Sequence, residues 1–312
     1  MRLRLTAVPG VILIAIAAAM WGTDPIIRKT MASTTSATTI VFGEHVILVA
    51  LTLPLLVPAL RALARASAPT LAAVVAIGAG ASAVATILFT DALIRTNYSI
   101  TSVVIQKIQP LVVVVGATAI LGERPRQRFG WFLLVALVGF WLVNQPHPLH
   151  PSAHGLVAIV EAAAAATLWG LGTVLGRYAS RELEFQQILS LRFFFGLVAS
   201  AVAVPIVGTK WYAGPHDSLL MVYLGIVTGL ISLALYYYGL RRTPALLSSL
   251  AELAYPAVFV IAAIYGLNQH LRWSQWIGVV VIVGIVTLLP IQRRRQMVEL
   301  SQRDALLEPA PA

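Results

Sequence analysis

Long apolar runs occupy almost the whole chain, and short stretches rich in polar residues, glycine and proline separate them. A helix needs about 20 apolar residues to cross the hydrocarbon core of a bilayer, and most of the runs approach that length. The pattern therefore predicts ten transmembrane helices, at residues 8–29, 37–60, 70–93, 98–121, 129–145, 154–176, 185–208, 218–240, 245–267 and 275–291. The residues after Gln292 are polar, so we expect a tail outside the bilayer.

The composition is typical of helical membrane proteins with several spans. Hydrophobic residues make up 59% of the 312 residues and charged residues only 11%, and the mean hydropathy is +0.85. A soluble domain of this length would need far more charge to cover its surface. The chain has no cysteine, which excludes disulfides and thiolate chemistry.

The net charge of +10 indicates membrane topology rather than nucleic-acid binding, because cytoplasmic loops of membrane proteins collect Lys and Arg. With the N-terminus inside, the inner loops hold fifteen of the 22 basic residues and the outer loops hold five. We therefore expect both termini to be cytoplasmic. The first apolar run has no clear small-residue cleavage site, so we expect it to be retained as a helix rather than removed as a secretory signal.

A polar pattern in the fourth predicted helix returns in the ninth, 146 residues later. The two copies are Ser102, Gln106, Gln109 and Pro110, and then Ser248, Glu252, Tyr255 and Pro256. A second pair of motifs, Trp21-Gly22 and Trp169-Gly170, relates the first predicted helix to the sixth. Polar groups at membrane depth are costly and usually face a cavity or a transport pathway, and we expect the same of these.

The duplication predicts the domain organisation. We expect a first repeat at residues 1–146, a linker at 147–153, a second repeat at 154–292 and a cytoplasmic tail at 293–312. Each repeat holds five predicted helices, and because five is odd, the second copy must enter the membrane inverted relative to the first. A duplicated unit with polar sites on proline-containing helices is typical of secondary transporters.

The segment from Ser102 to Val143 resembles the end of an EamA domain. It has a mid-span proline, then Gly122-Glu123 at the helix exit and a glycine-punctuated helix after that. The second copy departs from the pattern, because Asn268-Gln269 stand where Gly-Glu is expected. The chain as a whole resembles the EamA family of the drug/metabolite transporter superfamily, and within it is most similar to the YddG-type exporters of aromatic amino acids.

This resemblance implies an all-α integral membrane protein of the bacterial inner (plasma) membrane, with ten transmembrane helices in two inverted five-helix repeats. It implies a central cavity lined by predicted helices 1, 3, 4, 6, 8 and 9, with helices 5 and 10 at the periphery. The implied function is export of amino acids, aromatic or otherwise largely apolar, by alternating access. The implied partners are a small-molecule substrate and the lipid bilayer, without nucleic acid, and the chain is then a monomer or a weak dimer.

Other functions stay open at this point. The cargo could instead be a cationic drug or a sugar phosphate, although a phosphate calls for several basic cavity residues. A non-transport membrane subunit or an enzyme is a further alternative, but the sequence offers no convergent catalytic set, so we expect neither an enzyme nor a cofactor. Proton-coupled and facilitative transport are both compatible with the sequence. The histidines between positions 146 and 154 match no metal-ligand spacing, so we expect no metal site.

Polar and aromatic residues buried in the apolar runs are the candidate substrate-binding residues: Trp21, Ser102, Gln106, Gln109, Glu161, Trp169, Ser248, Glu252 and Tyr255. Three prolines are candidate helix hinges, because a proline frees backbone carbonyls within a helix: Pro25, Pro110 and Pro256. Charged residues at the predicted outer ends of the first and third helices are candidate gate residues: Asp24, Lys29, Asp91 and Arg95.

These candidates have structural alternatives. Glu252 could be a structural carboxyl paired with Lys107 or Arg192, and the alanine run after Glu161 could pack against a neighbouring helix. The charged residues of the candidate gate could be interface anchors. The three tyrosines at positions 236–238 lie near the predicted inner end of their helix, and we expect them to belong to the aromatic belt at the membrane interface.

Overall fold

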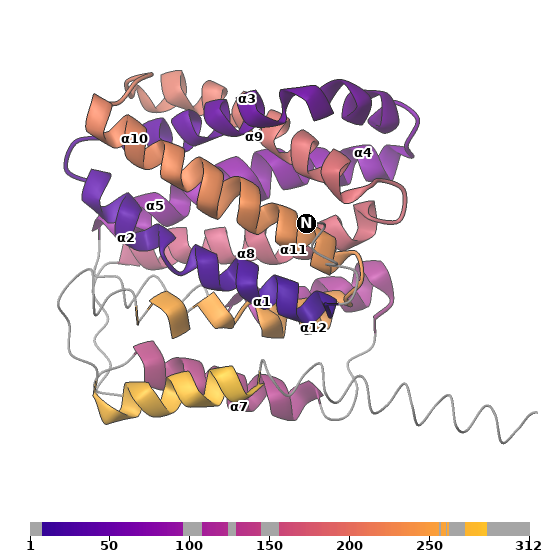
Figure 1. Ribbon diagram of the computed structural model, residues 1–312, viewed down its shortest axis with the longest axis vertical. Helices are drawn as coiled ribbons and strands as arrows, with labels where there is room; N and C mark the ends of the chain where they lie inside the picture. Colours follow the sequence, from indigo (N-terminus) through magenta and orange to yellow (C-terminus); the bar gives the residue numbers. More distant parts are fainter. Residues whose placement is uncertain are drawn as a thin grey trace, which may run out of the picture.

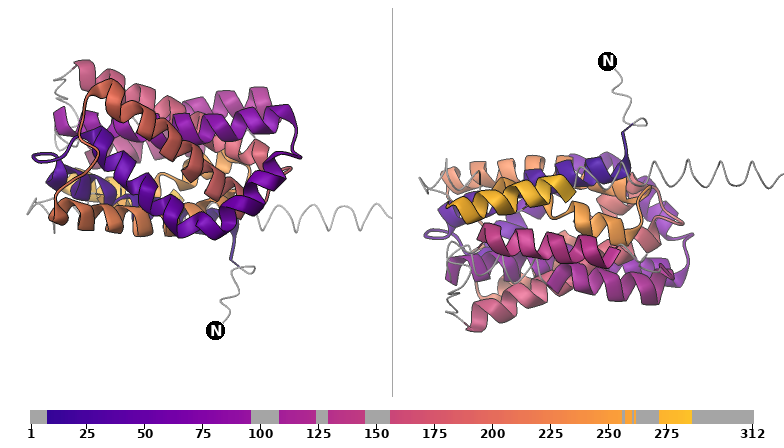
Figure 2. Two further views of the ribbon diagram at one scale, coloured as in Figure 1. Left: turned by 90° about the horizontal axis from the view of Figure 1, so that it is seen from above. Right: turned by 90° about the horizontal axis from the view of Figure 1, so that it is seen from below.

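A computed structural model describes residues 8–95, 108–123, 129–144, 156–255, 257–259, 261 and 272–285. This described part is helical and contains no strand. Its long helices lie side by side in a bundle whose loops gather at two opposite ends (Figure 1; Figure 2). Helix α7 and the helix Trp273–Ile285 form a layer at one side of this bundle (Figure 1).

The helices follow one another in this order: α1 (Gly10–Trp21), α2 (Asp24–Met31), α3 (Ala37–Leu63), α4 (Ala68–Val75), η2 (Ala76–Val84), α5 (Ala85–Arg95), Ile108–Leu121, α7 (Phe129–Asn144), α8 (Leu156–Ala179), α9 (Phe185–Val207), α10 (Pro215–Tyr223), η4 (Leu224–Ile231), α11 (Ser232–Leu240), α12 (Ala245–Ala251) and Trp273–Ile285. The segments η2 and η4 are π-helical, as is η3 (Ala117–Leu121), which forms the last part of the helix Ile108–Leu121. Helix α4 continues through η2 into α5, and α10 continues through η4 into α11. A short break at Gly22 and Thr23 separates α1 from α2.

Six described helices are long and apolar enough to cross a membrane: Gly10–Met31, Ala37–Leu63, Ala68–Arg95, Val157–Ala179, Phe185–Val207 and Pro215–Leu240. Each of them coincides with one of the predicted apolar runs, and the ends differ by a few residues. The other predicted runs correspond to shorter described helices or extend beyond the described residues. The all-helical membrane architecture is therefore confirmed, whereas the count of ten spans stays a prediction.

Local sequence explains where several helices begin. Ser36 precedes α3 and accepts a hydrogen bond from the backbone N–H of Thr39, and Ser67 does the same for Thr70 at the start of α4. Glu184 takes part in a capping box at the start of α9. Such caps satisfy N–H groups that the first turn of a helix leaves without partners. The chain can therefore turn sharply between long apolar helices.

Two of the three described π-helical segments, η2 and η4, lie at closely equivalent places, since η4 follows η2 by about 147 residues along the chain. Both segments pack closely on a neighbouring helix. A Cβ atom on Gly78 would lie 2.4 Å from the Cβ of Phe195 in α9, and one on Gly225 would lie 3.1 Å from Cγ2 of Ile47 in α3. π-Helical turns inside longer helices are frequent at functional sites, so these two segments are candidate positions for a site.

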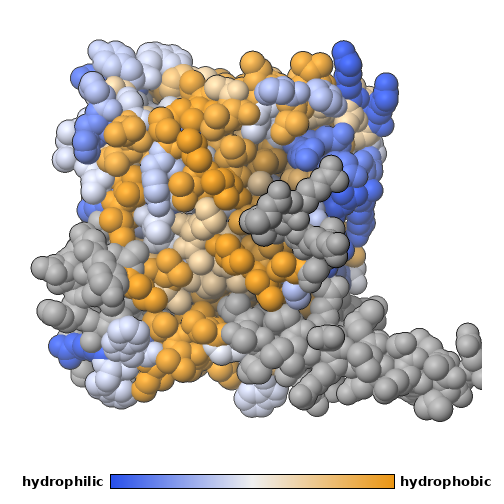
Figure 3. Space-filling model, in the orientation of Figure 1, coloured by the Kyte–Doolittle hydropathy of each residue, from blue (hydrophilic) through white to orange (hydrophobic). Residues whose placement is uncertain are grey.

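Apolar side chains cover the middle of the molecular surface between two more hydrophilic ends (Figure 3). The large exposed apolar side chains of the molecule include Leu53, Val57, Val115, Trp131, Ile206 and Val280. A soluble protein rarely exposes an extended apolar surface, whereas a helix bundle in lipid requires one. The molecule is a multi-pass membrane protein.

Helix crossings in the first part of the chain recur in the second part. Gly22 packs on the backbone near Tyr255, where a Cβ atom on the glycine would lie 2.8 Å from the Tyr255 carbonyl oxygen. Gly170 packs on the backbone near Gln109, where a Cβ atom would lie 3.0 Å from the Gln109 carbonyl oxygen. Gly170 follows Gly22 by 148 residues, and Tyr255 follows Gln109 by 146. Corresponding helices therefore cross at corresponding points.

A basic side chain donates a hydrogen bond to the C-terminal end of α5, and another does the same at the C-terminal end of α11. Lys29 Nζ donates a hydrogen bond to the carbonyl oxygen of Leu93 at 2.8 Å. Arg177 Nη1 lies at the equivalent position and donates to the carbonyl oxygen of Leu240 at 3.4 Å. A basic side chain at a helix C-terminus satisfies carbonyl groups and interacts favourably with the helix dipole. The two contacts fix α2 to α5 and α8 to α11.

Helices α2 and α8 run in opposite directions. The end of α2 lies beside the end of α5, because Lys29 contacts Leu93. The loop after α8 lies beside the start of α4, because the carboxylate of Glu182 accepts hydrogen bonds from Ser67 N at 2.8 Å and Thr70 Oγ1 at 2.7 Å. Since α4 to α5 is one continuous helix, these two contacts lie at opposite ends of the bundle.

Candidate functional site

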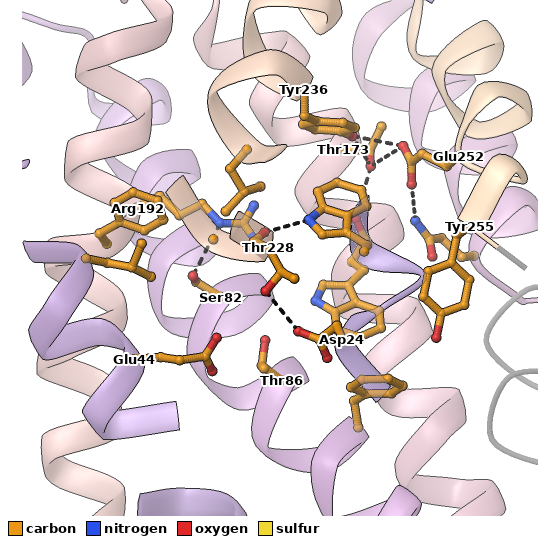
Figure 4. A pocket seen from close by; sticks show the side chains of 18 of the residues that line it. Asp24, Glu44, Ser82, Thr86, Thr173, Arg192, Thr228, Tyr236, Glu252 and Tyr255 are labelled. Atoms are coloured by element: carbon orange, nitrogen blue, oxygen red, sulfur yellow. Dashed lines mark hydrogen bonds between the residues drawn. The ribbon is translucent and has the colours of Figure 1, made fainter. Parts of the chain in front are cut away.

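A cavity of about 170 Å³ lies between the helices in the middle of the bundle. Its aromatic lining residues are Trp21, Phe89, Trp169, Phe193, Tyr236 and Tyr255. Its ionisable lining residues are Asp24, Arg28, Glu44, His45, Arg192 and Glu252. Hydroxyl and amide groups complete the polar part, from Ser82, Thr86, Gln109, Thr173, Thr228 and Ser249. Figure 4 shows ten of the lining residues with their labels.

Two aromatic pairs form part of the cavity wall. The ring centroids of Trp21 and Tyr236 are 5.3 Å apart, and those of Trp169 and Phe89 are 5.1 Å apart in an edge-to-face arrangement. The two tryptophans occupy equivalent positions in the sequence, as do Phe89 and Tyr236. Trp21 Nε1 also donates a hydrogen bond to the carbonyl oxygen of Thr228 at 2.8 Å, within the π-helical segment η4.

Glu252 is buried at the end of α12, where three helices direct polar groups at its carboxylate. The hydroxyl of Tyr236 in α11 donates to it at 2.9 Å, and Gln109 Nε2 donates from the helix Ile108–Leu121. Thr173 Oγ1 in α8 lies 3.4 Å from the same carboxylate. All three partners are neutral, so the buried charge is hydrogen-bonded but, among the described residues, has no paired cation.

A second cluster, the Arg28 cluster, consists of Asp24, Arg28 and Glu44. Arg28 Nε lies 2.5 Å from Asp24 Oδ1, and its Nη2 lies 2.8 Å from Glu44 Oε2. The guanidinium also donates to Thr90 Oγ1 at 3.3 Å, and Thr228 Oγ1 donates to Asp24 at 3.1 Å. The cluster therefore joins α2, α3, α5 and η4 around one buried cation and two carboxylates.

A third group of polar contacts surrounds Arg192 in α9. Its guanidinium donates to Ser82 Oγ at 3.3 Å, to the hydroxyl of Tyr237 at 3.1 Å and to the carbonyl oxygen of Ala81 at 3.2 Å. His45 Nε2 lies 3.0 Å from the same Ser82 Oγ. The π-helical segment η2, which contains Ala81 and Ser82, is thus held between side chains of α3 and α9.

The family comparison matches almost the whole chain. The model of the EamA-like transporter family matches residues 8–145 and again residues 156–290. The chain belongs to the EamA-like transporter family. Because this family is one of membrane transporters, the cavity of this EamA-like chain is a candidate substrate site, and an enzymatic function has no support from the family.

Curated relatives of this EamA-like chain are also transporters. A riboflavin transporter, ImpX, of Fusobacterium nucleatum is 26% identical over 266 residues, which cover 81% of this chain and 88% of the relative. An S-adenosylmethionine uptake transporter of Rickettsia prowazekii is 25% identical over 123 residues, or 38% of this chain and 40% of the relative. An uncharacterized transporter of Clostridium kluyveri is 25% identical over 156 residues, and the match spans half of that relative. These names do not include amino-acid export.

A solved crystal structure has the same fold. It superposes with a TM-score of 0.69 over 92% of this chain and 98% of that chain, at 18% sequence identity. At this identity the likeness extends to the helical architecture and not to a substrate.

The structure brings several of the predicted site residues together. Trp21, Gln109, Trp169, Glu252 and Tyr255 all line the cavity, as do the candidate hinge Pro110 and the candidate gate residue Asp24. Two predicted substrate-binding residues are not among its lining residues. Ser248 Oγ donates to the carbonyl oxygen of Pro244 at 3.1 Å, and Glu161 lies beside Arg95 with an O···N distance of 3.5 Å.

The other predicted gate and hinge residues have separate positions. Arg95 also pairs with Asp91 at 2.7 Å, at the end of α5 and away from the cavity lining. Lys29 is bonded to the end of α5, as described above. Pro25 lies in the first turn of α2, just after the break that separates this helix from α1. Three further predicted residues lie outside the described residues: Ser102, Gln106 and Pro256.

Tyr236 and Tyr237 correct one expectation from the sequence. They are 3% and 0% exposed, so they do not belong to an aromatic belt at the surface. Burial of a tyrosine requires a partner for its hydroxyl, and Glu252 and Arg192 are these partners. The equivalence of Tyr236 with Phe89 and its apolar helix were the available signals, but three consecutive tyrosines do not indicate which of them points inward.

The cavity also has a broader lining than the family resemblance implied. α3 contributes Glu44, His45 and Leu48, and α9 contributes Arg192 and Phe193. These helices correspond to predicted helices 2 and 7. The charged residues on them were visible in the sequence as polar positions inside apolar runs, and their burial is consistent with the rule that such residues face the bundle interior.

Proposed function

We propose that this EamA-like chain is an inner-membrane secondary transporter that exports amino acids, aromatic or otherwise largely apolar, by alternating access. The observation that carries the proposal is the central cavity, which is lined by two aromatic pairs and by the buried carboxylate of Glu252. A carboxylate whose protein partners are all neutral can accept charge-assisted hydrogen bonds from the ammonium group of an amino acid. The tryptophan rings offer an apolar surface to its side chain and a π-face to its cation.

The size of the cavity supports a small cargo. Its volume of about 170 Å³ is close to that of an engineered cavity of roughly 150 Å³ that binds benzene. A sugar phosphate is disfavoured because the described lining offers two arginines, and one of them, Arg28, is already paired with two carboxylates. The residues proposed to contact the cargo are Trp21, Gln109, Trp169, Glu252 and Tyr255, with Ser102, Gln106, Glu161 and Ser248 as further candidates from the sequence.

Two inverted five-helix repeats with ten spans are the proposed architecture. The recurring contacts support it, because Gly22 and Gly170 pack on equivalent backbones and Lys29 and Arg177 cap equivalent helices. The opposite directions of α2 and α8 are those of an inverted pair. In such transporters one repeat rocks against the other around a fixed central site. Pro25, Pro110 and Pro256 are the proposed hinges, and Asp24, Lys29, Asp91 and Arg95 the proposed gate.

Counterflow into proteoliposomes tests the proposal. Vesicles that contain the purified chain are preloaded with an unlabelled amino acid, and uptake of labelled phenylalanine, tryptophan, leucine, riboflavin, S-adenosylmethionine and glucose 6-phosphate is compared, with and without a proton gradient. We expect the amino acids to exchange fastest, and Glu252→Gln to slow this exchange at unchanged expression. Glu184→Gln is the matched control, because it makes the same change at an exposed carboxylate outside the cavity lining. If the chain exchanges none of the amino acids in this panel, the proposal is wrong.

Riboflavin is the second candidate cargo. The relative named as a riboflavin transporter matches over 88% of its own length, and aromatic side chains stack with a flat ring system. A neutral flavin would, however, leave the buried carboxylate of Glu252 without a charged ligand. In the same panel, riboflavin exchange that survives Glu252→Gln would favour this alternative.

The proposed orientation, with both termini cytoplasmic, has its own test. The chain has no cysteine, so a single introduced cysteine can be labelled without background. We expect Ser67→Cys, between α3 and α4, to be reached from the cytoplasm and Ser152→Cys, in the predicted linker, from the opposite side. The reverse labelling pattern would contradict the orientation.

A further inference from the structure

Arg192 is a buried cation in the wall of the central cavity. It is 9% exposed and lines the cavity from α9. Its hydrogen bonds go to Ser82 Oγ, to the Tyr237 hydroxyl and to the Ala81 carbonyl oxygen, which are all neutral. A guanidinium has five N–H donors, so these three bonds leave one N–H on each terminal nitrogen. Within the described residues Arg192 forms no ion pair with a carboxylate.

Arg28 provides the internal comparison, because it is a second buried arginine that lines the same cavity. Its charge is matched by Asp24 at 2.5 Å and by Glu44 at 2.8 Å. A buried guanidinium in a membrane protein is costly unless a negative group compensates it. Arg28 has its compensation within the protein, whereas the described part of the chain supplies none in contact with Arg192.

Glu252 is a buried anion that lines the same cavity. Its carboxylate accepts hydrogen bonds from Tyr236, Thr173 and Gln109 and has no paired cation among the described residues. Figure 4 places Arg192 and Glu252 on opposite sides of the cavity, on α9 and after α12. The two charges interact electrostatically across this space without forming a direct ion pair. One cation and one anion therefore face the same cavity.

We infer that Arg192 binds the carboxylate of the cargo while Glu252 binds its ammonium group, so that the cavity selects zwitterions over cations and anions of similar size. This inference rests on the proposed function and deepens it, because it names the two charges by which the site recognises an amino acid. A guanidinium matches a carboxylate with parallel hydrogen bonds, which makes arginine the suitable receptor for this group. A ligand with both charges compensates both buried groups at once, whereas a ligand with one charge leaves the other group uncompensated.

Three ligands that differ in charge test the inference on the purified full-length chain. L-phenylalanine carries both charges, L-phenylalaninamide carries the ammonium group alone, and 3-phenylpropionate carries the carboxylate alone. Isothermal titration calorimetry gives the Kd of each. For the wild type we expect phenylalanine to bind at least roughly tenfold more tightly than either of the other two, since each loses a hydrogen-bonded charge pair.

Two substitutions then assign each charge to its residue. Arg192→Gln should weaken phenylalanine and phenylpropionate roughly 10- to 100-fold and leave phenylalaninamide unchanged. Glu252→Gln should weaken phenylalanine and phenylalaninamide and leave phenylpropionate unchanged. Arg192→Lys keeps the positive charge but lacks the parallel N–H donors of a guanidinium, and it should give an intermediate Kd for phenylalanine. Arg61→Gln, which removes an exposed cation outside the cavity, is the matched control and should bind all three ligands like the wild type.

Different failures have different meanings. If phenylalanine and phenylalaninamide bind the wild type equally well, the inference is wrong, and this comparison needs no variant to fold. If Arg192→Gln weakens both ligands equally, Arg192 supports the fold of the cavity and the inference is again wrong, while amino-acid transport stands. If the wild type binds none of the three ligands and counterflow detects another cargo, the proposed function is overturned and the inference with it.

Discussion

The two ends of the helix bundle share a scaffold but differ in the side chains that pack just inside them. Near the end where α2 and α5 stop, the buried Arg28 cluster joins two carboxylates to one cation. Near the end where α8 and α11 stop, Gly176 packs against the ring of Tyr237, and a Cβ atom on this glycine would lie 2.8 Å from the ring. A buried ion cluster therefore occupies one region, and a close contact between a glycine and an aromatic ring occupies the other.

The positions that differ are equivalent in the proposed repeat. Asp24, Arg28 and Glu44 in the first half correspond to Gly172, Gly176 and Leu191 in the second half. The contacts that recur, such as Lys29 with α5 and Arg177 with α11, involve backbone carbonyls and helix crossings. Shared contacts therefore belong to the scaffold, and the unshared charges are where a transport cycle can treat the two ends of the bundle differently.

The largest expected effect comes from breaking the Arg28 cluster. Arg28→Gln leaves the carboxylates of Asp24 and Glu44 buried together without a cation. Removal of one partner from a buried charged cluster typically costs about 3–5 kcal/mol, so we expect a large fall in the midpoint of thermal unfolding in detergent. The triple substitution Asp24→Asn, Arg28→Gln and Glu44→Gln removes all three charges and should recover most of the loss.

Arg95→Gln is the control for this prediction. Arg95 also pairs with a carboxylate, but its side chain is 52% exposed. Exposed ion pairs contribute roughly 0–1 kcal/mol, so the unfolding midpoint should change little. An Arg28→Gln variant that is as stable as Arg95→Gln would show that the Arg28 cluster does not hold this region of the bundle.

A pair of substitutions at the shared helix crossings tests the common scaffold. A side chain at Gly22 or Gly170 would lie within 3.0 Å of backbone atoms of the crossing helix. We expect Gly22→Val and Gly170→Val to lower stability by similar amounts, about 1–3 kcal/mol each, because overpacking forces the helices apart. Gly130→Val is the control, since nothing lies within 4 Å of a Cβ atom at that position. If only one of the two crossings is sensitive, the two halves do not share this scaffold contact.

The sequence predicted the helices well because length decides membrane spans. The run at 37–60 became α3 (Ala37–Leu63), and the run at 185–208 became α9 (Phe185–Val207). The paired tryptophans that the sequence singled out both line the cavity. Hydrophobic runs and repeated motifs are local properties of the chain, so they can be identified without knowing how the helices pack.

The sequence could not predict how each helix is rotated about its own axis. In a membrane protein the lipid-facing and interior-facing sides are both apolar, so a helix such as α11 offers no hydrophobic stripe that indicates its inward face. Tyr236 was therefore assigned to the surface, although it bonds to Glu252. Glu161 was assigned to the cavity, although it lies beside Arg95. The π-helical segments change the helix register further, and their glycines alone do not predict them.

A smaller effect distinguishes the two equivalent tryptophans. Trp21 Nε1 donates to the Thr228 carbonyl oxygen at 2.8 Å, whereas the indole N–H of Trp169 has no hydrogen-bond partner among the described residues. We expect Trp21→Phe to lower stability by roughly 0.5–1.5 kcal/mol more than Trp169→Phe, the usual net contribution of one hydrogen bond. Thermal unfolding of the two variants measures the difference. Equal losses would mean that aromatic packing alone explains the role of both residues.

The smallest effect concerns a hydrogen bond between a loop and the start of a helix, which occurs at both ends of the bundle with the donor and acceptor positions reversed. At one end of the bundle Thr34 Oγ1 donates to Asp217 at 2.6 Å. At the other end, Thr70 Oγ1 donates to Glu182 at 2.7 Å. Thr34 and Glu182 are equivalent positions, as are Thr70 and Asp217. Both contacts therefore join a loop to the start of a helix, but the carboxylate belongs to the helix in one contact and to the loop in the other.

Glu182 makes this contact dependent on pH. Hydrogen bonds from the Ser67 hydroxyl, the Ser67 backbone N–H and the Thr70 hydroxyl lower the pKa of the Glu182 carboxyl. A carboxyl whose pKa is lowered by folding stabilises the protein above its unfolded-state pKa, and this contribution is lost as the pH falls through the folded-state pKa. We therefore expect Glu182→Gln to unfold at a slightly lower temperature than the wild type at neutral pH, and the difference to vanish on acidification. Because the carboxylate is exposed, a large difference at neutral pH, or one that persists in acid, would mean that the loop is held by something other than this charge.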